Sequence, residues 1–284
     1  MTILPARDRR ATIIALGLPI MGGMASQNVL NLVDTAMVGT LGDTALAATG
    51  MGGFANFMAI SLIMGLSSGV QAIAARRLGE KRHDVLAVAL NAGLIIAVLW
   101  SIPWIAALHH FAPGLFGLLL DDPAVVAEAV PYFRIRCLGA LGVGINFAFR
   151  GYWNGINLPK LYMGTLIIAH ITNLFLNWVL IFGNLGAPAL GTAGAAIAST
   201  TATYVASITY IGLGLRLAIK NGFLSRPPST DTFKKLLRLT LPASIAQFFM
   251  ATGYTTLMWI VGQTGTAQLA AANVLLTVTL VAIL

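Results

Sequence analysis

Charged residues are scarce in this chain of 284 residues, because Asp, Glu, Lys and Arg together make up only 9% of it. Soluble domains carry about 25% charged residues, so this composition excludes an ordinary soluble domain. Cysteine is almost absent as well, and Cys137 alone offers neither an internal disulfide nor a metal-binding spacing. The chain also lacks a P-loop, a dinucleotide fingerprint and a nucleophile elbow. We therefore expect neither an enzyme nor a bound cofactor.

Hydrophobic residues make up 57% of the chain and form long runs from end to end. A helix that crosses a bilayer needs ~20 mostly apolar residues. We place such spans near residues 12–40, 46–75, 85–108, 126–152, 161–183, 193–218 and 236–262, with an eighth that begins near residue 267. Met1 to Arg10 is short and charged and no cleavage site follows it, so we predict no cleavable signal peptide. The predicted fold class is an all-α integral membrane protein, a polytopic helical bundle.

The net charge of +8 is distributed unevenly over the predicted loops. Lys and Arg gather before the first span, after the second, after the fourth, and between the sixth and seventh, which are alternate loops on one side. The opposite loops carry Asp43, Asp121 and Asp122, and only Arg134 and Arg136 break the pattern. The positive-inside rule therefore predicts a multi-pass protein of the cytoplasmic (inner) membrane with a cytoplasmic N-terminus.

These basic residues are orientation signals rather than a nucleic-acid surface. The expected partners are the lipid bilayer and a small-molecule substrate, without nucleic acid, and we expect a monomer.

The sequence contains an internal repeat at an offset of 223 residues. The matching segments are Leu16-Gly17-Leu18-Pro19 with Leu239-Thr240-Leu241-Pro242, Val38-Gly39 with Val261-Gly262, Gly42 with Gly265, and Leu46-Ala47-Ala48 with Leu269-Ala270-Ala271. Both copies start on the cytoplasmic side, so the halves would be parallel and related by an axis along the membrane normal, as in some secondary transporters.

The repeat predicts three segments. These are a complete six-helix transmembrane lobe over residues 1–220, a cytoplasmic linker over 221–232, and the first two helices of a second, incomplete lobe over 233–284. Residues 274–284 end inside an apolar run, and twice 223 is roughly 450 residues, so we expect a C-terminally truncated transporter. The alternative is a genuine protein of eight spans.

Asp34 is the acidic residue that lies well inside an apolar span. A carboxylate in hydrocarbon costs on the order of 3 kcal/mol or more, so it needs a partner, a pathway or an aqueous cavity. Gln27, Asn31 and Asp34 follow the spacing i, i+4 and i+7, which puts all three on one helix face. That face predicts the lining of a polar cavity. The alternative is an aspartate that is paired for helix packing.

Asn173 and Asn177 lie one turn apart on the fifth span, where amides must find partners on another helix or in a wet cavity. Taken alone, they suit helix packing as well as binding. Ser199 lies on the sixth span, where a hydroxyl can also bond its own backbone. His170 is alone in the fifth span and is predicted to be a hydrogen-bonded residue at a helix contact.

Two prolines lie inside spans and are related by the repeat, Pro19 in the first and Pro242 in the seventh. A proline inside a helix removes one backbone hydrogen bond and permits a bend. We predict that both are hinges, with static kinks as the alternative.

Several motifs follow one another in a specific order along the chain. They are Leu18-Pro19, Leu32-Val33-Asp34-Thr35-Ala36-Met37-Val38-Gly39, Gly69-Val70-Gln71 with Gly79, Arg134-Ile135-Arg136, Phe149-Arg150-Gly151, Asn173-Leu174-Phe175-Leu176-Asn177 and Gly191-Thr192-Ala193-Gly194-Ala195-Ala196-Ile197-Ala198. In this order the chain resembles the multidrug and toxic compound extrusion (MATE) transporters, particularly the DinF-like branch.

This resemblance implies twelve helices in two six-helix lobes, with a central cleft that opens alternately to each side. It implies export of organic cations and other amphipathic compounds in exchange for protons or sodium. The essential aspartate of the family matches Asp34, and its polar partners match Asn173, Asn177 and Ser199. Some relatives carry a second aspartate at the position of Asn177. Sodium-coupled relatives can carry a glutamate after a Phe-Phe pair in the seventh helix, where this chain has Met250.

The sequence therefore predicts a secondary active antiporter that exports drugs by alternating access, with Asp34 as the coupling carboxylate. Gln27, Asn31, Asn173, Asn177 and Ser199 are the predicted lining of the substrate and cation cavity. One alternative is a flippase for lipid-linked precursors, for which Arg134 and Arg136 would be the cationic residues. The other is a membrane scaffold without transport activity.

Overall fold

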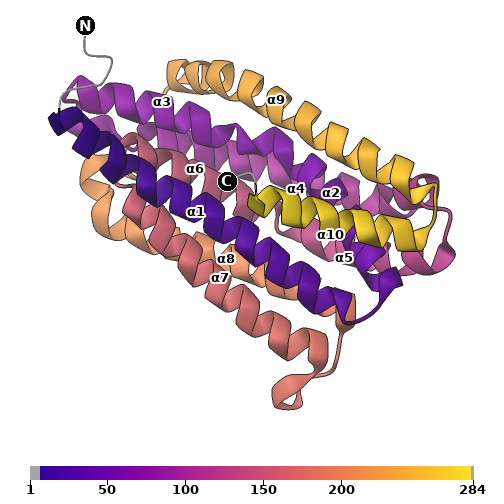
Figure 1. Ribbon diagram of the computed structural model, residues 1–284. Coiled ribbons are helices and arrows are strands. Elements are labelled where there is room, and N and C mark those ends of the chain that lie inside the picture. Colours follow the sequence, from indigo (N-terminus) through magenta and orange to yellow (C-terminus); the bar gives the residue numbers. More distant parts are fainter. Residues whose placement is uncertain (1–6, 283–284) are drawn as a thin grey trace, which may run out of the picture.

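The computed structural model describes residues 7–282, and the side chains of residues 14–279. The first six and last two residues of the predicted segments 1–220 and 233–284 therefore lie outside the described residues, as does most of Met1 to Arg10. Figure 1 shows long helices that run side by side in one bundle, and the described part of the chain contains no strand. An all-α fold is confirmed.

Ten helices make up the bundle within residues 7–282. They are α1 (Arg7–Gly39), α2 (Asp43–Met64), α3 (Leu66–Gly79), α4 (Val88–Leu119), α5 (Pro123–Leu138), α6 (Ala140–Gly155), α7 (Pro159–Phe182), α8 (Gly191–Leu217), α9 (Thr230–Gly262) and α10 (Thr266–Ala282). Short 3-10 turns occupy His83–Val85, Asn184–Gly186 and Ile219–Asn221.

All eight predicted spans coincide with these helices, the second with α2 and α3 together and the fourth with α5 and α6 together. By length and hydropathy, three helical stretches of the described chain can cross a membrane: Asp43–Gly79, His83–Leu119 and Pro159–Phe182. Helices α1 and α9 are long enough, at 33 residues each, but they carry more polar side chains.

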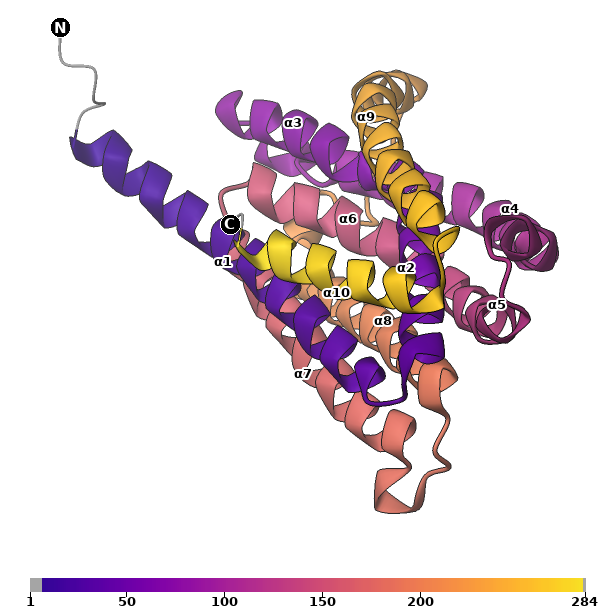
Figure 2. The ribbon, with the colours of Figure 1, turned by 45° about the vertical axis from the view of Figure 1, so that its right-hand side comes forward.

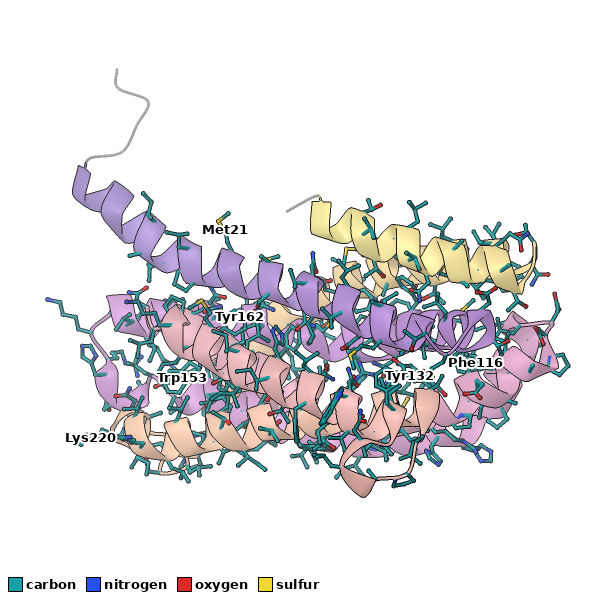
Figure 3. All side chains as sticks on the ribbon, turned by 60° about the horizontal axis from the view of Figure 1, so that its bottom comes forward. Met21, Phe116, Tyr132, Trp153, Tyr162 and Lys220 are labelled. Carbon is teal, nitrogen blue, oxygen red and sulfur yellow. The ribbon has the colours of Figure 1, made fainter. Side chains whose placement is uncertain are left out.

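The two ends of the bundle are named here by the orientation that the charges predict. The outer end is where α1, α4 and α7 finish, and the inner end is where the 221–232 linker lies. In Figure 3 the inner end carries Lys220 and the outer part carries Phe116. Apolar cores fill both parts, with Met51, Phe116 and Phe133 near the outer end and Tyr152 near the inner end.

The second and fourth spans are interrupted at Gly65 and Gly139, which the sequence analysis did not predict. A Cβ atom at Gly65 would lie 2.5 Å from the backbone oxygen of Thr240, so only glycine lets α9 approach α2 this closely. Pro19 and Pro242, by contrast, lie inside continuous helices. Their role as hinges stays a prediction.

The helix boundaries follow the offset of the sequence repeat. Helices α1 and α9 both start and end 223 residues apart, and so do the first residues of α2 and α10. The turns between them also match, because Gly42 and Gly265 both have positive φ angles, of 106° and 134°. These matches support the predicted relation between the two halves.

The two copies meet where α10 packs against α2. Asn273 of α10 contacts Gly50 of α2, and these residues are repeat equivalents because 273 − 50 = 223. Asn273 Nδ2 also donates to the backbone oxygen of Leu46 over 3.2 Å. Helix α10 lies against α1 as α2 lies against α9, and Figure 2 shows α10 between these neighbours. A rotation axis between α2 and α10 that relates the two halves would therefore exchange the contact of α10 with α1 and the contact of α2 with α9.

The linker is held to the first lobe by a buried amide at the start of α4. Asn91 is only 6% exposed, and its Nδ2 donates to the backbone oxygens of Gly222 and Arg226 over 2.8 and 2.9 Å. Its Oδ1 accepts from the backbone N–H of Leu224 over 3.1 Å. The start of the linker is therefore an ordered part of the inner end.

Candidate functional site

Asp34 is turned toward α7. Its Oδ1 accepts a hydrogen bond of 2.7 Å from Asn177 Nδ2. One level nearer the inner end, Gln27 Oε1 lies 3.3 Å from His170 Nε2. Both pairs are 143 residues apart, so α1 and α7 run parallel and in register over two turns. The prediction that His170 is a hydrogen-bonded residue at a helix contact is confirmed.

Asn173 joins Asp34 to α8. One end of its amide lies 2.9 Å from Asp34 Oδ1, and the other end lies 3.1 Å from Ser199 Oγ. An amide presents N–H donors at one end and a carbonyl acceptor at the other. An ionised carboxylate only accepts hydrogen bonds, so it requires the NH₂ end, whereas a protonated carboxyl can donate to the oxygen. With its NH₂ end toward Ser199 Oγ, Asn173 accepts a hydrogen bond of 3.2 Å from Asn177 Nδ2 through Oδ1, whereas the reversed amide presents its NH₂ end to Asp34.

Two residues of α5 complete the site, and the sequence analysis did not assign them to it. Arg136 is close enough to interact electrostatically with both Asp34 and Tyr132. Tyr132 lies inside the bundle in Figure 3, and it fits there because α2 has no side chain at Gly52. A Cβ atom at Gly52 would lie 2.7 Å from Tyr132 Cδ1. No periodicity could reveal this, because the contacts join residues far apart in the sequence.

Burial differs across the predicted site residues. Asn173 and Asn177 are 3% and 1% exposed, Asp34 and Gln27 are half-buried, and Asn31 is exposed. Gln27 Nε2 donates to Asn31 Oδ1 over 3.0 Å, so the polar face of α1 continues beyond Asp34. Asp34 is thus neither turned outward nor sealed. The residues of α1, α7 and α8 that were predicted to share a site are brought together.

Asn177 has one unused polar atom. Its Oδ1 is buried and accepts no hydrogen bond from the described residues. The other end of the same amide, Nδ2, donates to Asp34. Nowhere in residues 14–279 do three His, Cys, Asp or Glu side chains gather in a way that could hold a metal ion.

The hydroxyls of α8 divide into two kinds. Thr203 Oγ1 donates to the backbone oxygen of Ser199 in its own helix, as its position in a helix allows. Thr200 Oγ1 instead donates to the backbone oxygen of Ile135 on α5 over 3.1 Å. Thr200 therefore connects α8 to the segment that carries Arg136, whereas the Ser199 hydroxyl faces Asn173 on α7.

A second acid within a span was also missed. Glu128 lies on α5 nearer the outer end, where its Oε2 accepts a hydrogen bond from Thr192 Oγ1 at the start of α8. Glu128 is only the third residue of the predicted span 126–152, where an acid is common, so the sequence alone does not mark it.

The sequence and the fold both match known proteins. A family model described as MatE matches residues 19–179, which is more than half of the chain. The chain belongs to the MatE family. Among curated relatives, the multidrug resistance protein NorM of Vibrio vulnificus (strain YJ016) is 25% identical, over 94% of this chain and 59% of the relative. The probable multidrug resistance protein NorM of Burkholderia pseudomallei (strain K96243) is 29% identical, over 98% of this chain and 60% of the relative.

Solved structures agree with this assignment. An outward-facing conformation of a multidrug resistance MATE family transporter has a TM-score of 0.75 at 25% identity, over 95% of this chain and 63% of the other. An inward-facing conformation of a transporter of that family has a TM-score of 0.79 at 24% identity, over 92% and 60%. This chain is therefore a helical membrane bundle of a transporter family, as predicted, and not an enzyme. It spans about 60% of the length of the curated relatives it matches.

Proposed function

We propose that this chain provides the first lobe and the opening helices of the second lobe of a secondary active antiporter. The antiporter exports amphipathic or cationic small molecules across the cytoplasmic membrane by alternating access. The observation that carries the proposal is the half-buried Asp34 carboxylate, held by Asn177 and met by the amide of Asn173. The names of the relatives, which are multidrug resistance proteins, support the substrate class.

The segments keep the proposed boundaries: lobe 1–220, linker 221–232 and incomplete second lobe 233–284. The N-terminus is proposed to be cytoplasmic and the transporter to act as a monomer. The DinF-like branch remains our assignment on the sequence motifs.

Protonation of Asp34 would act through Asn173. With the carboxylate ionised, the NH₂ group of Asn173 points to Asp34 and its oxygen accepts from the Ser199 hydroxyl. With the carboxyl protonated, the amide turns over and its NH₂ group donates to Ser199 Oγ. One proton therefore changes hydrogen bonds on α1, α7 and α8 together. Loss of the negative charge at the same time removes the attraction for a cationic substrate.

A proton suits this site better than sodium as the coupling ion. Sodium prefers several oxygen ligands, and among the side chains of residues 14–279 Asp34 is the one carboxylate that contacts Asn173 and Asn177. The guanidinium of Arg136 lies near that carboxylate, and its positive charge opposes the binding of a sodium ion there. A proton needs only one carboxyl oxygen and a partner that can change its donor and acceptor roles.

Movement of the substrate would use the rest of the α1 face. Gln27 and Asn31 continue the polar surface from Asp34 toward the inner end. Pro19 lies further along the same helix, and Pro242 occupies the equivalent position in α9. A bend at Pro19 would move this polar face relative to α7, which is the role we propose for both prolines.

The flippase alternative is weakened by the positions of its two arginines. Arg134 Nε donates to the backbone oxygen of His109 on α4 over 3.0 Å, whereas Arg136 lies beside Tyr132 and Asp34. The pair therefore does not line one cationic cavity. A scaffold without transport activity would leave the cost of a half-buried carboxylate unexplained.

The test is Asp34→Asn in the full-length gene product, reconstituted in vesicles with separately imposed proton and sodium gradients. The amide cannot exchange a proton, so we expect proton-driven efflux of a fluorescent cation to be abolished while the protein inserts normally. Asp43→Asn is the matched control, because Asp43 is an exposed acid at the outer end. Full proton-driven efflux by Asp34→Asn would refute the coupling role, and efflux that follows only the sodium gradient in the unmodified protein would refute proton coupling.

A further inference from the structure

An open groove lies between α4 and α5, outside the Asp34 site. Its volume is about 500 Å³. Its main lining residues are Ile102, Ile105, His109, His110, Arg134 and Leu138. Figure 2 shows α4 and α5 side by side at one edge of the bundle, so the groove opens at the periphery.

The groove is polar at one end and apolar at the other. On α4, which runs toward the outer end, Ile102 and Ile105 precede His109 and His110. Helix α5 runs the opposite way, so that Leu138 lies deeper than Arg134. Both helices therefore place cationic or titratable side chains toward the outer end and apolar side chains toward the membrane interior.

The polar end lies about one bilayer thickness along α4 from the start of that helix. Helix α4 has 32 residues, or roughly 48 Å at 1.5 Å per residue, whereas the hydrocarbon core is about 30 Å thick. His109 follows Val88, the first residue of α4, by 21 residues, or roughly 32 Å. If α4 begins at the inner surface, His109 stands where the lipid headgroups begin at the outer end.

Arg134 is available to bind an anion at that level. Its Nε is fixed by the backbone oxygen of His109, and its guanidinium makes no ion pair with the side chains of residues 14–279. The two acids nearest to it on α5 and its N-cap have other partners. Asp122 accepts a hydrogen bond from Thr266, and Glu128 accepts one from Thr192. A planar guanidinium with free N–H groups matches the oxygens of a phosphate.

We propose that this groove binds one anionic phospholipid from the leaflet at the outer end. The phosphate lies against Arg134 with the two histidines beside it, and an acyl chain lies along Ile102, Ile105 and Leu138. A phospholipid presents anionic phosphate and apolar chain in the same order and at the same depths. The proposal rests on the proposed membrane orientation and not on transport or on Asp34.

The test is native mass spectrometry of the full-length protein with added dioleoyl-phosphatidylglycerol or dioleoyl-phosphatidylcholine. We expect the anionic lipid to bind more tightly, and Arg134→Gln to weaken its binding about fivefold, the effect of one basic residue near an anionic surface. Arg134→Lys keeps the charge but loses the planar fork, so its loss is smaller. The matched control is Arg216→Gln, an exposed arginine near the inner end, which leaves binding unchanged.

A second variant tests the apolar part without touching Arg134. Leu138 is 45% exposed, so Leu138→Trp is tolerated by the fold, fills the groove and lowers binding of the anionic lipid. Equal binding of the two lipids would overturn the proposal. So would equal losses from Arg134→Gln and Arg216→Gln, unchanged binding in Leu138→Trp, or inorganic phosphate that competes as well as the lipid, which would indicate a site for small anions.

Discussion

The amide of Asn173 is the part of the site whose role is most open to test. If it turns over when Asp34 gains or loses a proton, then Asn173 and Ser199 act as one unit. We consider Asn173→Leu, which keeps a similar volume but removes both hydrogen-bonding ends, and Ser199→Ala, which removes only the hydroxyl. The two side chains are 3.1 Å apart, so the pair suits a double-mutant cycle.

The expected magnitudes follow from the bonds that are lost. Asn173→Leu removes the hydrogen bond to the ionised Asp34 carboxylate, which is worth about 1.5–3 kcal/mol. Because the ionised state must form in each proposed transport cycle, we expect the transport rate to fall roughly 10- to 150-fold. Ser199→Ala removes a neutral bond of about 1 kcal/mol, or roughly fivefold. In the double variant the serine has already lost its partner, so its substitution adds almost nothing to the loss.

The assay is the initial rate of fluorescent-cation efflux from proteoliposomes under a fixed proton gradient, normalised to inserted protein. Thr172→Val is the control on α7, because the Thr172 hydroxyl bonds only the backbone oxygen of Ile168 in its own helix. We expect that variant to transport normally. Losses that simply multiply in the double variant would show that Asn173 and Ser199 act independently, and the proposed switch would then be wrong.

Two further predictions concern packing and pH. Gly65→Ala places a Cβ 2.5 Å from the backbone oxygen of Thr240 and destabilises the protein by about 1–3 kcal/mol. Gly53→Ala is the control, because a Cβ there meets no atom within 4 Å. Equal thermal unfolding temperatures of the two variants in detergent would contradict this prediction. The hydrogen bond from Thr266 holds the pKa of Asp122 below its usual range, as does the backbone N–H of Ala124 to a lesser extent. Its stabilising effect is therefore complete above the unfolded pKa of about 3.9 and is lost as the pH falls further. The unfolding temperatures of the unmodified protein and Asp122→Asn should therefore differ above about pH 4 and converge as the pH falls below it, and parallel curves would refute this.

The sequence predicted the spans and the repeat because both depend on local pattern. Hydropathy placed all eight predicted spans where the structure has helices, and the offset of 223 residues reappears in the boundaries of α1 and α9. The spacing of Gln27, Asn31 and Asp34 on one helix face holds because α1 is an uninterrupted helix. Helical periodicity is a property of neighbouring residues, so it can be read without knowing the partner helix.

What the sequence did not predict depends on contacts between distant segments. The breaks at Gly65 and Gly139 could not be distinguished from the many other glycines, because their cause is a neighbouring helix or a local distortion. Arg134 and Arg136 seemed equivalent in the sequence, yet the first contacts α4 and the second lies near Asp34. Side chains two residues apart on a helix point in directions that differ by about 200°. Only the packing of the helices decides what each side chain then contacts.

The contact between Gly50 and Asn273 limits how a protein of this kind can arise. In a dimer of two identical half-length chains, this position would face its own copy across the axis. Two asparagines would collide there, since Asn273 already leaves no room for a Cβ atom opposite, and two glycines would leave a gap without the bond to Leu46. A small residue opposite a large one requires two different sequences, so a symmetric dimer of one half-length chain could not reproduce this contact between α2 and α10.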